Sequence, residues 1–238
     1  MHPLLATRSF LQRALLATPQ EPPRPKSTQL QRARVISVVA LIAGGTLLAI
    51  ALHIQPGDGL FYPVTLGVAA VWAIAGVAGR GLRVGVATDS RGRETSPAGQ
   101  GAVLGLALLA IFLIGALIVA QIPLLRGPVD ALLDHARFGA LPAVLAVTVV
   151  TGIAEELFFR GTLYDAVPAR VAIPATTVLY ALVTAVSGVP LLVFASLILG
   201  SVTALQRRAT GGQLGPIITH VIWSSGMLLL LPPILDNL

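Results

Sequence analysis

Three ionisable side chains lie inside apolar stretches of this sequence. Glu155 and Glu156 are adjacent in "TGIAEELFFRGTLYDA", residues 151–166, and His220 lies in "GGQLGPIITHVIWSSG". Charged groups are costly in the interior of a membrane and are usually retained there for a function. A carboxylate beside an imidazole, screened from bulk water, can transfer protons. These three residues are therefore the first candidates for a site that does chemistry.

The two adjacent glutamates are predicted to have different roles. Arg160 follows Glu156 by four residues, so the two side chains share a helix face and can form an ion pair that fixes the helix end. Glu155 points about 100° away around the helix, on a face with small and polar residues such as Thr148 and Gly152. Such a stripe is typical of a helix face that points into a bundle. Glu155 is thus either a catalytic carboxylate or a buried, protonated and hydrogen-bonded group.

His220 is expected at a similar depth in the membrane. Counted from the predicted helix ends, Glu155 lies about 7 Å and His220 about 9–12 Å from the same membrane face. Ser224 follows His220 by four residues on the same helix face. We therefore expect Glu155 and His220 to share one pocket. The alternative for His220 is a packing residue whose hydrogen bonds are satisfied.

The composition is that of a membrane protein. The chain is 55% hydrophobic and 11% charged, with a mean hydropathy of +0.85, whereas a soluble domain carries about 25% charged residues. Its apolar runs are continuous rather than alternating, which predicts membrane helices and excludes a barrel. The predicted fold is all-α, a multi-pass bundle of about seven transmembrane helices (six to eight). The expected spans are residues 35–54, 60–79, 100–122, 139–160, 172–188, 190–206 and 213–234.

The basic residues indicate an orientation with the N-terminus in the cytoplasm. In that orientation all 16 Lys and Arg residues except Arg126 and Arg137 lie on the cytoplasmic side, as the positive-inside rule requires. The net charge of +6 therefore reflects membrane orientation, and we expect no nucleic-acid partner. The chain has no cysteine, which excludes disulfides and thiolate chemistry.

The first 34 residues differ from the rest and are treated as a separate region. The stretch "TPQEPPRPKSTQ" is proline-rich and polar, which is typical of a disordered cytoplasmic tail. Before it, leucines alternate with Arg8 and Arg13, which predicts a short amphipathic helix on the membrane surface. The predicted domains are this tail, residues 1–34, and a transmembrane helical domain, residues 35–234.

The motif "EELFFRG" resembles the E-E-x-x-x-R motif of the CAAX-processing and bacteriocin-processing intramembrane protease family. Glu155, Glu156 and Arg160 match the paired glutamates and the arginine, and His220 matches the histidine of a motif near the C-terminus. The resemblance covers about residues 100–232. It implies that the first glutamate helps to activate a water molecule for attack on a peptide bond, and that the C-terminal histidine holds the oxyanion.

Two positions depart from the family pattern. The family's second motif, F-x-x-x-H, falls on "YALVT", where Tyr180 stands for the aromatic residue and Thr184 occupies the histidine position. Ser224 stands where the family commonly has asparagine. Threonine cannot accept or deliver a proton at neutral pH as imidazole does, and losing an acid–base partner typically costs a factor of about 10²–10⁴ in rate. Tyr180, Thr184 and Ser224 are predicted to line the pocket.

A metal site is disfavoured. Catalytic zinc commonly has three protein ligands, often two histidines and a glutamate, whereas this chain has one intramembrane histidine and no H-E-x-x-H motif. We therefore expect no metal and no cofactor, although family members are often labelled metalloproteases.

Taken together, the sequence predicts a bacterial multi-pass protein of the cell (plasma) membrane with endopeptidase activity near the cytoplasmic leaflet. Glu155 would be the base and His220 the oxyanion donor, with Glu156 and Arg160 as the supporting pair. The expected partners are membrane lipids and a hydrophobic or membrane-associated peptide or protein substrate. The bacterial assignment rests on the short tail and the absence of cysteine.

Two alternatives remain open. The first is a catalytically impaired pseudoprotease, acting as an immunity-type scaffold or a binder of membrane peptides, which the threonine at position 184 motivates. The second is a small proton-coupled transporter that uses Glu155 and His220 as a proton relay. A transporter of this size would usually show inverted repeats and paired broken helices, and the sequence shows neither.

Overall fold

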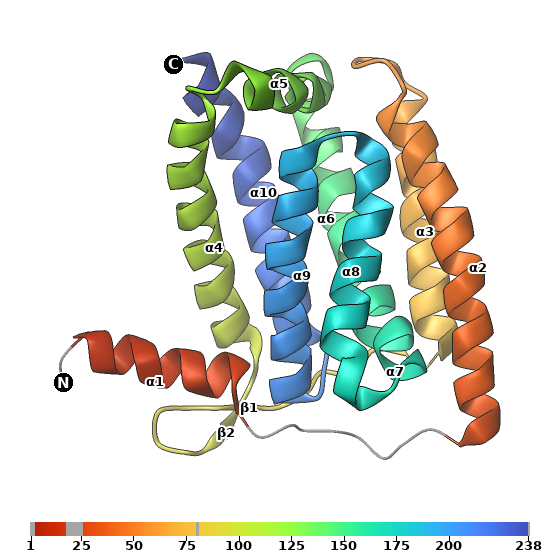
Figure 1. Cartoon of the computed structure of the whole chain (residues 1–238), viewed down its shortest axis with the longest axis vertical. Helices are drawn as coiled ribbons and strands as arrows, with labels where there is room; N and C mark the ends of the chain where they lie inside the picture. The colour runs from red at the N-terminus through yellow and green to blue at the C-terminus, as the bar shows by residue number, and fades with distance from the viewer. Residues whose placement is uncertain (1–2, 18–25, 80, 238) are drawn as a thin grey trace.

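The computed structural model describes residues 3–17, 26–79 and 81–237. Within these residues seven helical segments are long and apolar enough to cross a membrane, which confirms the predicted all-α bundle (Figure 1). The seven segments are α2 (Ser27–Leu52), α3 (Phe61–Gly79), α4 (Ala98–Val119), α6 through α7 (Leu141–Ala166), α8 with its flanking turns (Ala169–Ser187), α9 (Pro190–Thr210) and α10 (Leu214–Asp236).

Two of these segments differ from the predicted boundaries by more than four residues. The first span, α2, begins at Ser27 rather than at residue 35. A helix can continue through polar residues beyond the apolar run that the prediction counted. The fourth span does not end at residue 160. It passes from α6 (Leu141–Leu157) into a π-helix (Phe158–Thr162) and then into α7 (Leu163–Ala166).

Small residues allow the helices to approach one another closely. A Cβ added at Gly101 of α4 would lie 2.6 Å from the backbone oxygen of Gly215 on α10. A Cβ at Gly76 of α3 would lie 2.8 Å from the backbone of Leu157 on α6. Membrane helices associate through packing of this kind, because lipid tails provide no hydrophobic drive between helices. The glycines thus fix the distance of α4 from α10 and of α3 from α6.

The turns on either side of α9 follow ordinary helix-end chemistry. Gly188, with φ of 68°, ends the segment before α9, and Pro190 occupies the first turn of α9. Gly211, with φ of 72°, ends α9 in the same left-handed conformation. Glycine adopts this conformation without steric cost, and proline is pre-organised for the first helical turn. Two short glycine turns therefore place α8, α9 and α10 side by side.

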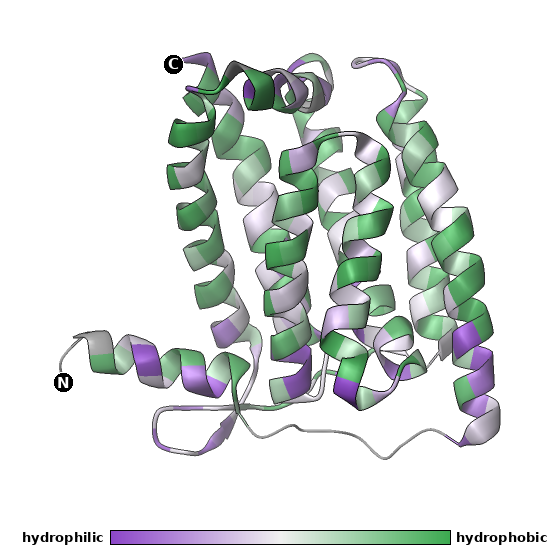
Figure 2. Ribbon diagram, in the orientation of Figure 1, coloured by the Kyte–Doolittle hydropathy of each residue, from purple (hydrophilic) through white to green (hydrophobic). Residues whose placement is uncertain are grey.

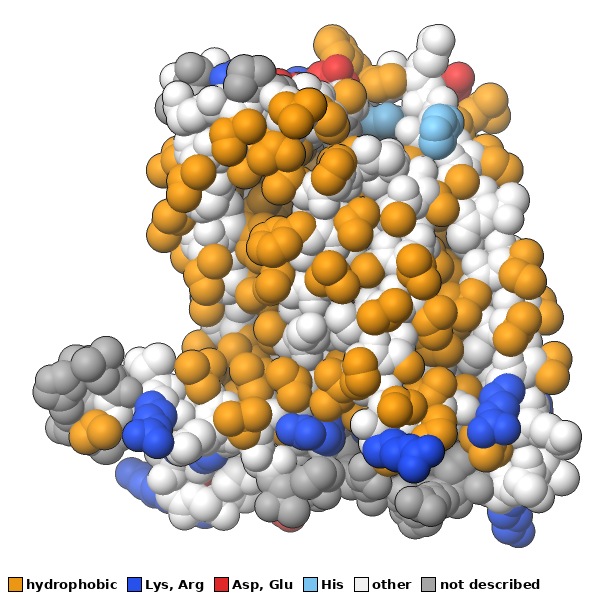
Figure 3. All heavy atoms as spheres, viewed as in Figure 1, with side chains coloured by type: hydrophobic (Ala, Val, Ile, Leu, Met, Phe, Trp, Pro, Cys, Tyr) orange, Lys and Arg blue, Asp and Glu red, His pale blue; other side chains and the backbone are white. Residues whose placement is uncertain are grey.

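Polar and charged residues gather at the two ends of the bundle (Figure 2). On the face shown in Figure 3, most of the visible Lys and Arg side chains lie at the end that carries α1, whereas the histidine side chains and most of the visible acidic ones lie at the opposite end. An apolar band lies between them. This distribution matches the pattern from which the orientation was inferred, while the assignment of the basic end to the cytoplasm stays a prediction.

The N-terminal region contains a helix where an amphipathic surface helix was predicted. Helix α1 (Pro3–Leu15) lies at the basic end, across the direction of the spans (Figure 1). Leu5 and Leu11 are exposed, while Ala14 is fully buried. Most of the proline-rich stretch, residues 18–25, lies outside the described residues, so its predicted disorder stays a prediction.

The loop after α3 closes the basic end of the bundle. It forms a short antiparallel pair of strands, β1 (Ala87–Thr88) and β2 (Glu94–Thr95). Two backbone hydrogen bonds, from Val86 to Thr210 (2.9 Å) and from Gln213 to Arg83 (2.7 Å), tie the loop to the turn between α9 and α10.

Helix α5 (Pro123–Phe138) was not predicted. It lies across the end of the bundle opposite to α1 (Figure 1). The signal was present, because Leu125, Val129 and Leu133 are spaced by four residues, but the segment is too polar for a span. Arg137 pairs with Asp130 and Asp134, at 3.1 Å each, and with Asp236 on α10. Burial opposes the charged form, yet these acidic partners raise the pKa of Arg137 above its ordinary value.

Candidate active site

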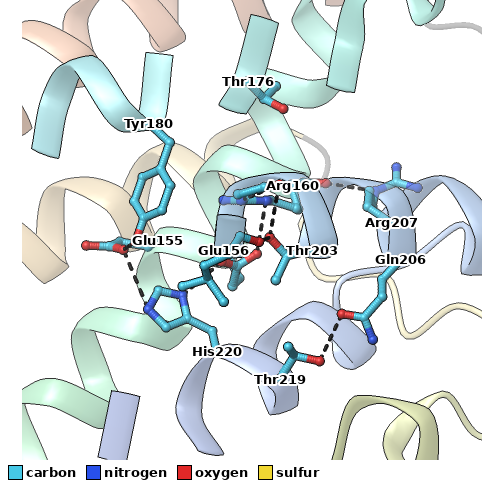
Figure 4. Close-up of polar contacts among 12 residues, drawn as sticks. Glu155, Glu156, Arg160, Thr176, Tyr180, Thr203, Gln206, Arg207, Thr219 and His220 are labelled. Carbon is cyan, nitrogen blue, oxygen red and sulfur yellow. Dashed lines mark hydrogen bonds and ion pairs between the residues drawn. The ribbon is translucent and has the colours of Figure 1, made fainter. Parts of the chain in front are cut away.

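Three helices bring together the side chains that were predicted to share a pocket (Figure 4). Glu155 comes from α6, Tyr180 from α8 and His220 from α10. The phenol of Tyr180 donates a hydrogen bond of 2.7 Å to Glu155 Oε2, and His220 Nε2 lies 3.9 Å from the same oxygen. The Glu155 side chain is 13% exposed and lines a cavity of about 240 Å³. This carboxylate is therefore accessible to a small molecule inside the bundle.

Glu156 has two partners, not one. Its Oε2 lies 3.2 Å from Arg160 Nε, which is the ion pair expected from the sequence, and its Oε1 lies 2.9 Å from His220 Nδ1. The sequence assigned His220 to Glu155 instead. The two imidazole nitrogens face different carboxylates, so His220 bridges both glutamates and its hydrogen bond goes to Glu156. Glu156 is 0% exposed, which removes it from contact with a substrate.

These contacts assign the protonation of the imidazole. A carboxylate paired with an arginine, as Glu156 is with Arg160, can only accept hydrogen bonds. We therefore assign a proton to His220 Nδ1, which leaves Nε2 as the nitrogen on the side of Glu155. A carboxylate that holds an imidazole through Nδ1 also orients the histidine of Ser-His-Asp hydrolases. Nε2 is thus the imidazole nitrogen that lies nearest to Glu155.

Arg160 is anchored by the π-helix in which it lies. Its guanidinium is fully buried, donates a hydrogen bond of 3.0 Å to the carbonyl of Gly200, and lies over the Tyr180 ring at 5.2 Å. Its own carbonyl accepts a hydrogen bond of 2.7 Å from Arg207 Nε. Single-turn π-helices occur frequently at functional sites. Here the widened turn holds the supporting arginine between α8 and α9.

Glu155 lies deeper than the predicted boundary implied. The span ends at Ala166, which follows Glu155 by 11 residues, or about 16 Å of helix at 1.5 Å per residue. The sequence put Glu155 about 7 Å from the membrane face because it ended the span at residue 160, whereas the helical segment continues to Ala166. His220 nevertheless reaches Glu155, with Nε2 3.9 Å from Glu155 Oε2.

The two positions that depart from the family motifs both line the 240 Å³ cavity. Thr184 Oγ1 donates a hydrogen bond of 2.9 Å to the carbonyl of Tyr180, one turn earlier in α8. Ser224 Oγ points to the carbonyl of Val221 at 3.5 Å. Both hydroxyls are directed at their own helices, so neither forms a hydrogen bond to Glu155 or His220.

A packed polar layer separates the site from the basic end. Thr219 Oγ1 lies 2.8 Å from Gln206 Oε1 and 3.0 Å from the carbonyl of Gly101, and Thr219, Gln206 and Gln213 are each 0% exposed. The cavity extends in the other direction, because its lining includes Leu52, at the α5 end of the bundle. The sequence had placed the reaction near the cytoplasmic leaflet without indicating this direction of access.

Much of the cavity wall could not be predicted as part of a site. It includes apolar and small polar residues of α2, α3 and α9 that carry no motif. These residues are Leu48, Leu52, Phe61, Thr65, Leu192 and Ser196. On α6, Gly152 lies against the imidazole, since a Cβ there would be at van der Waals distance, 3.4 Å, from His220 Cδ2.

A second, larger cavity of about 500 Å³ adjoins the first. The two share several wall residues, among them Leu192, Trp223 and Ser224, and the second is otherwise lined mostly by apolar residues of α4, α5, α9 and α10. On the face seen in Figure 3, apolar side chains border a hollow between α4 and α9. Phe112 of α4 and Phe194 of α9 approach across it, with ring centroids 6.3 Å apart. The site thus adjoins an apolar space that borders this face of the bundle.

Among the described residues, no group of three or more His, Asp or Glu side chains is arranged to hold a metal ion. Glu155, Glu156 and His220 are instead engaged with Tyr180 and Arg160. The prediction that the reaction needs no metal or cofactor stays a prediction.

Fold and site together define a multi-pass helical membrane protein with a buried carboxylate–imidazole centre. Residues 137–226 match the model of a protein family described as type II CAAX prenyl endopeptidase Rce1-like. This match confirms the family resemblance that the motifs indicated, over a region that runs from the end of α5 to α10 and contains all the candidate site residues. No curated protein and no solved structure matches the chain.

Proposed function

We propose that this protein is an intramembrane endopeptidase in which Glu155 activates water. One observation carries the proposal: a carboxylate that faces a cavity lies beside an imidazole whose other nitrogen is held by Glu156. This arrangement supplies a proton acceptor and a positioned nitrogen at one place. The family match supports the same class of reaction.

The proposed reaction begins with a water molecule between Glu155 and the substrate carbonyl. Glu155 takes a proton from the water, and the water oxygen attacks the carbonyl carbon of the peptide bond. When the imidazole carries a proton on Nε2 as well as on Nδ1, His220 Nε2–H can donate a hydrogen bond to the oxyanion that forms. The C–N bond then breaks, and Glu155 returns its proton to the leaving amine nitrogen. The products are a carboxyl group and an amine, and the enzyme is regenerated.

The two cavities indicate the kind of substrate. Ligand sites are usually apolar clefts of about 300–1,000 Å³ with a few convergent polar groups, and the larger cavity, about 500 Å³, meets this description. We propose that a hydrophobic or membrane-associated peptide enters from the lipid through the hollow between α4 and α9. We also propose that the membrane is the plasma membrane of a bacterium, with the basic end of the bundle in the cytoplasm.

The test compares purified wild type with Glu155→Gln in detergent, on a panel of fluorogenic peptides that carry either a prenyl group or an apolar segment. We expect the wild type to cleave at least one peptide and Glu155→Gln to lose that activity. Mass spectrometry of the products identifies the cleaved bond. Cleavage at the same rate and position by both proteins would refute the role of Glu155.

A second candidate function follows from Thr184. Its hydroxyl is directed at the carbonyl of Tyr180, so it offers no proton-transferring group to Glu155. If the wild type cleaves no peptide of the panel but Thr184→His does, the protein is a pseudoprotease that binds membrane peptides. Binding of the same peptides to the inactive wild type would then be measured by fluorescence anisotropy.

A further inference from the structure

The side chain at position 184 supplies no group that can transfer a proton to or from Glu155. The family pattern has a histidine there, and Thr184 lines the same cavity as Glu155 but bonds to its own helix. His220 Nε2 is 3.9 Å from Glu155 Oε2, which is beyond hydrogen-bond distance. The orientation of the catalytic carboxylate must therefore come from another group.

That group is Tyr180, one turn before Thr184 on α8. Its phenol lies 2.7 Å from Glu155 Oε2, within the range of a hydrogen bond from a neutral donor to a carboxylate. Within the part of the chain that the structure describes, it is the one side chain that forms a hydrogen bond to Glu155. In the family motif this position holds an aromatic residue, typically phenylalanine, which has no hydroxyl. The sequence comparison therefore classed Tyr180 with the pocket wall.

The Tyr180 ring is held in place by its neighbours. The ring of Phe159 is 4.9 Å away, the guanidinium carbon of Arg160 is 5.2 Å from its centroid, and the ring of His220 is 6.4 Å away. The residue is 8% exposed. Because the ring is already fixed, little further side-chain entropy is lost when the phenol binds the carboxylate of Glu155. Its position thus does not depend on a bound substrate.

We propose that Tyr180 is a positioning residue that takes the place of the missing histidine. Its O–H donates to Glu155 Oε2 and so fixes the carboxylate with Oε1 as the oxygen that receives the proton of the water. The phenol keeps its own proton throughout: the proton moves from water to Glu155 and from Glu155 to the leaving amine. This role rests on the proposed endopeptidase function and deepens it, because it explains how the site works with threonine at position 184.

The decisive variant is Tyr180→Phe, which removes one oxygen atom and restores the family's phenylalanine. We expect kcat to fall by about 10- to 100-fold, the usual value of a hydrogen bond to a charged group, while KM stays within about twofold. The double variant Tyr180→Phe/Thr184→His recreates the complete F-x-x-x-H motif and should recover at least part of the lost kcat. Tyr62→Phe is the matched control, because the Tyr62 hydroxyl bonds to the backbone of Ala140, away from both glutamates.

The outcomes separate this inference from the function on which it rests. If the wild type is inactive on the whole panel, the proposed function fails and the role of Tyr180 fails with it. If the wild type is active and Tyr180→Phe keeps its kcat, only the role of Tyr180 is overturned. A loss of similar size in Tyr62→Phe, or a double variant no faster than Tyr180→Phe, also overturns it. Thermal unfolding of each variant tests whether a loss of rate comes from unfolding.

Discussion

Replacement of Arg160 by methionine tests the central polar network of the bundle. Arg160 is 0% exposed and pairs with Glu156, which is also 0% exposed. Methionine fills a similar length but removes the charge. The carboxylate of Glu156 would then be buried with His220 as its remaining partner. We expect Arg160→Met to destabilise the protein strongly.

The expected magnitude follows from the contacts that are lost. Removing one partner of a buried ion pair typically costs about 3–5 kcal/mol, because the other charge is left uncompensated. Arg160 also loses its hydrogen bond of 3.0 Å to the carbonyl of Gly200 and its contact with the Tyr180 ring. The double variant Glu156→Gln/Arg160→Met removes both charges, so its loss should be smaller than the sum of the two single losses by about 0.5–3 kcal/mol.

Unfolding can be followed by intrinsic fluorescence. The chain has two tryptophans, and both are buried: Trp72 stacks on Phe158 and Trp223 lies beside His220. Thermal or SDS-induced unfolding in detergent would be compared among wild type, Arg160→Met, Glu156→Gln, the double variant and the exposed control Arg170→Met. If Arg160→Met loses no more stability than Arg170→Met, or if the two single losses add without coupling, the inferred network is wrong.

Two further predictions concern packing and access. Gly101→Ala should destabilise the protein by about 1–3 kcal/mol, since the added methyl would meet the backbone of α10. In the control Gly99→Ala the same methyl meets nothing within 4 Å, so stability should rise by up to about 1 kcal/mol. Equal effects of the two variants in SDS titrations would contradict the close approach of α4 and α10. Leu192 lines both cavities, so Leu192→Trp should lower kcat/KM by on the order of tenfold with little change in the unfolding temperature. The control Leu197→Trp, on the exposed side of the same helix, should leave kcat/KM unchanged. An unchanged kcat/KM in Leu192→Trp would place substrate entry elsewhere.

The sequence was sufficient for the number and type of the spans. Each span is a continuous apolar run close to the length of a bilayer crossing, so hydropathy alone locates it. Helix α5 was missed because it is amphipathic and too polar for a span, and its partner on α10, Asp236, lies about one hundred residues away. The end of the fourth span was missed because Arg160 marked the expected membrane boundary, whereas the structure buries it inside the bundle.

The site was predictable in composition but not in connectivity. Intramembrane charges and helical spacing singled out Glu155, Glu156, Arg160 and His220, and the structure brings all four together. The choice of hydrogen-bond partner depends on the rotation of α10 about its axis, which periodicity does not determine. For this reason the hydrogen bond of His220 to Glu156 was not expected.

The role of Tyr180 was hidden for a different reason. A comparison with a motif that specifies an aromatic residue does not register a hydroxyl group that phenylalanine lacks. The absence of a histidine at position 184 was visible in the sequence. The hydrogen bond of the Tyr180 phenol to Glu155 was not. Only the distance of 2.7 Å between the Tyr180 phenol and Glu155 Oε2 reveals it.

The most direct test of the central claim is a single-turnover measurement with wild type and Glu155→Gln. Both proteins would be mixed in excess with the best peptide of the panel, and the product with the new carboxyl terminus would be quantified by mass spectrometry over time. Because Glu155 is proposed to be the proton acceptor, the rate should fall by a factor of at least about 100 in Glu155→Gln, at an unchanged unfolding temperature. A rate within about threefold of the wild type would contradict the claim that Glu155 activates the water.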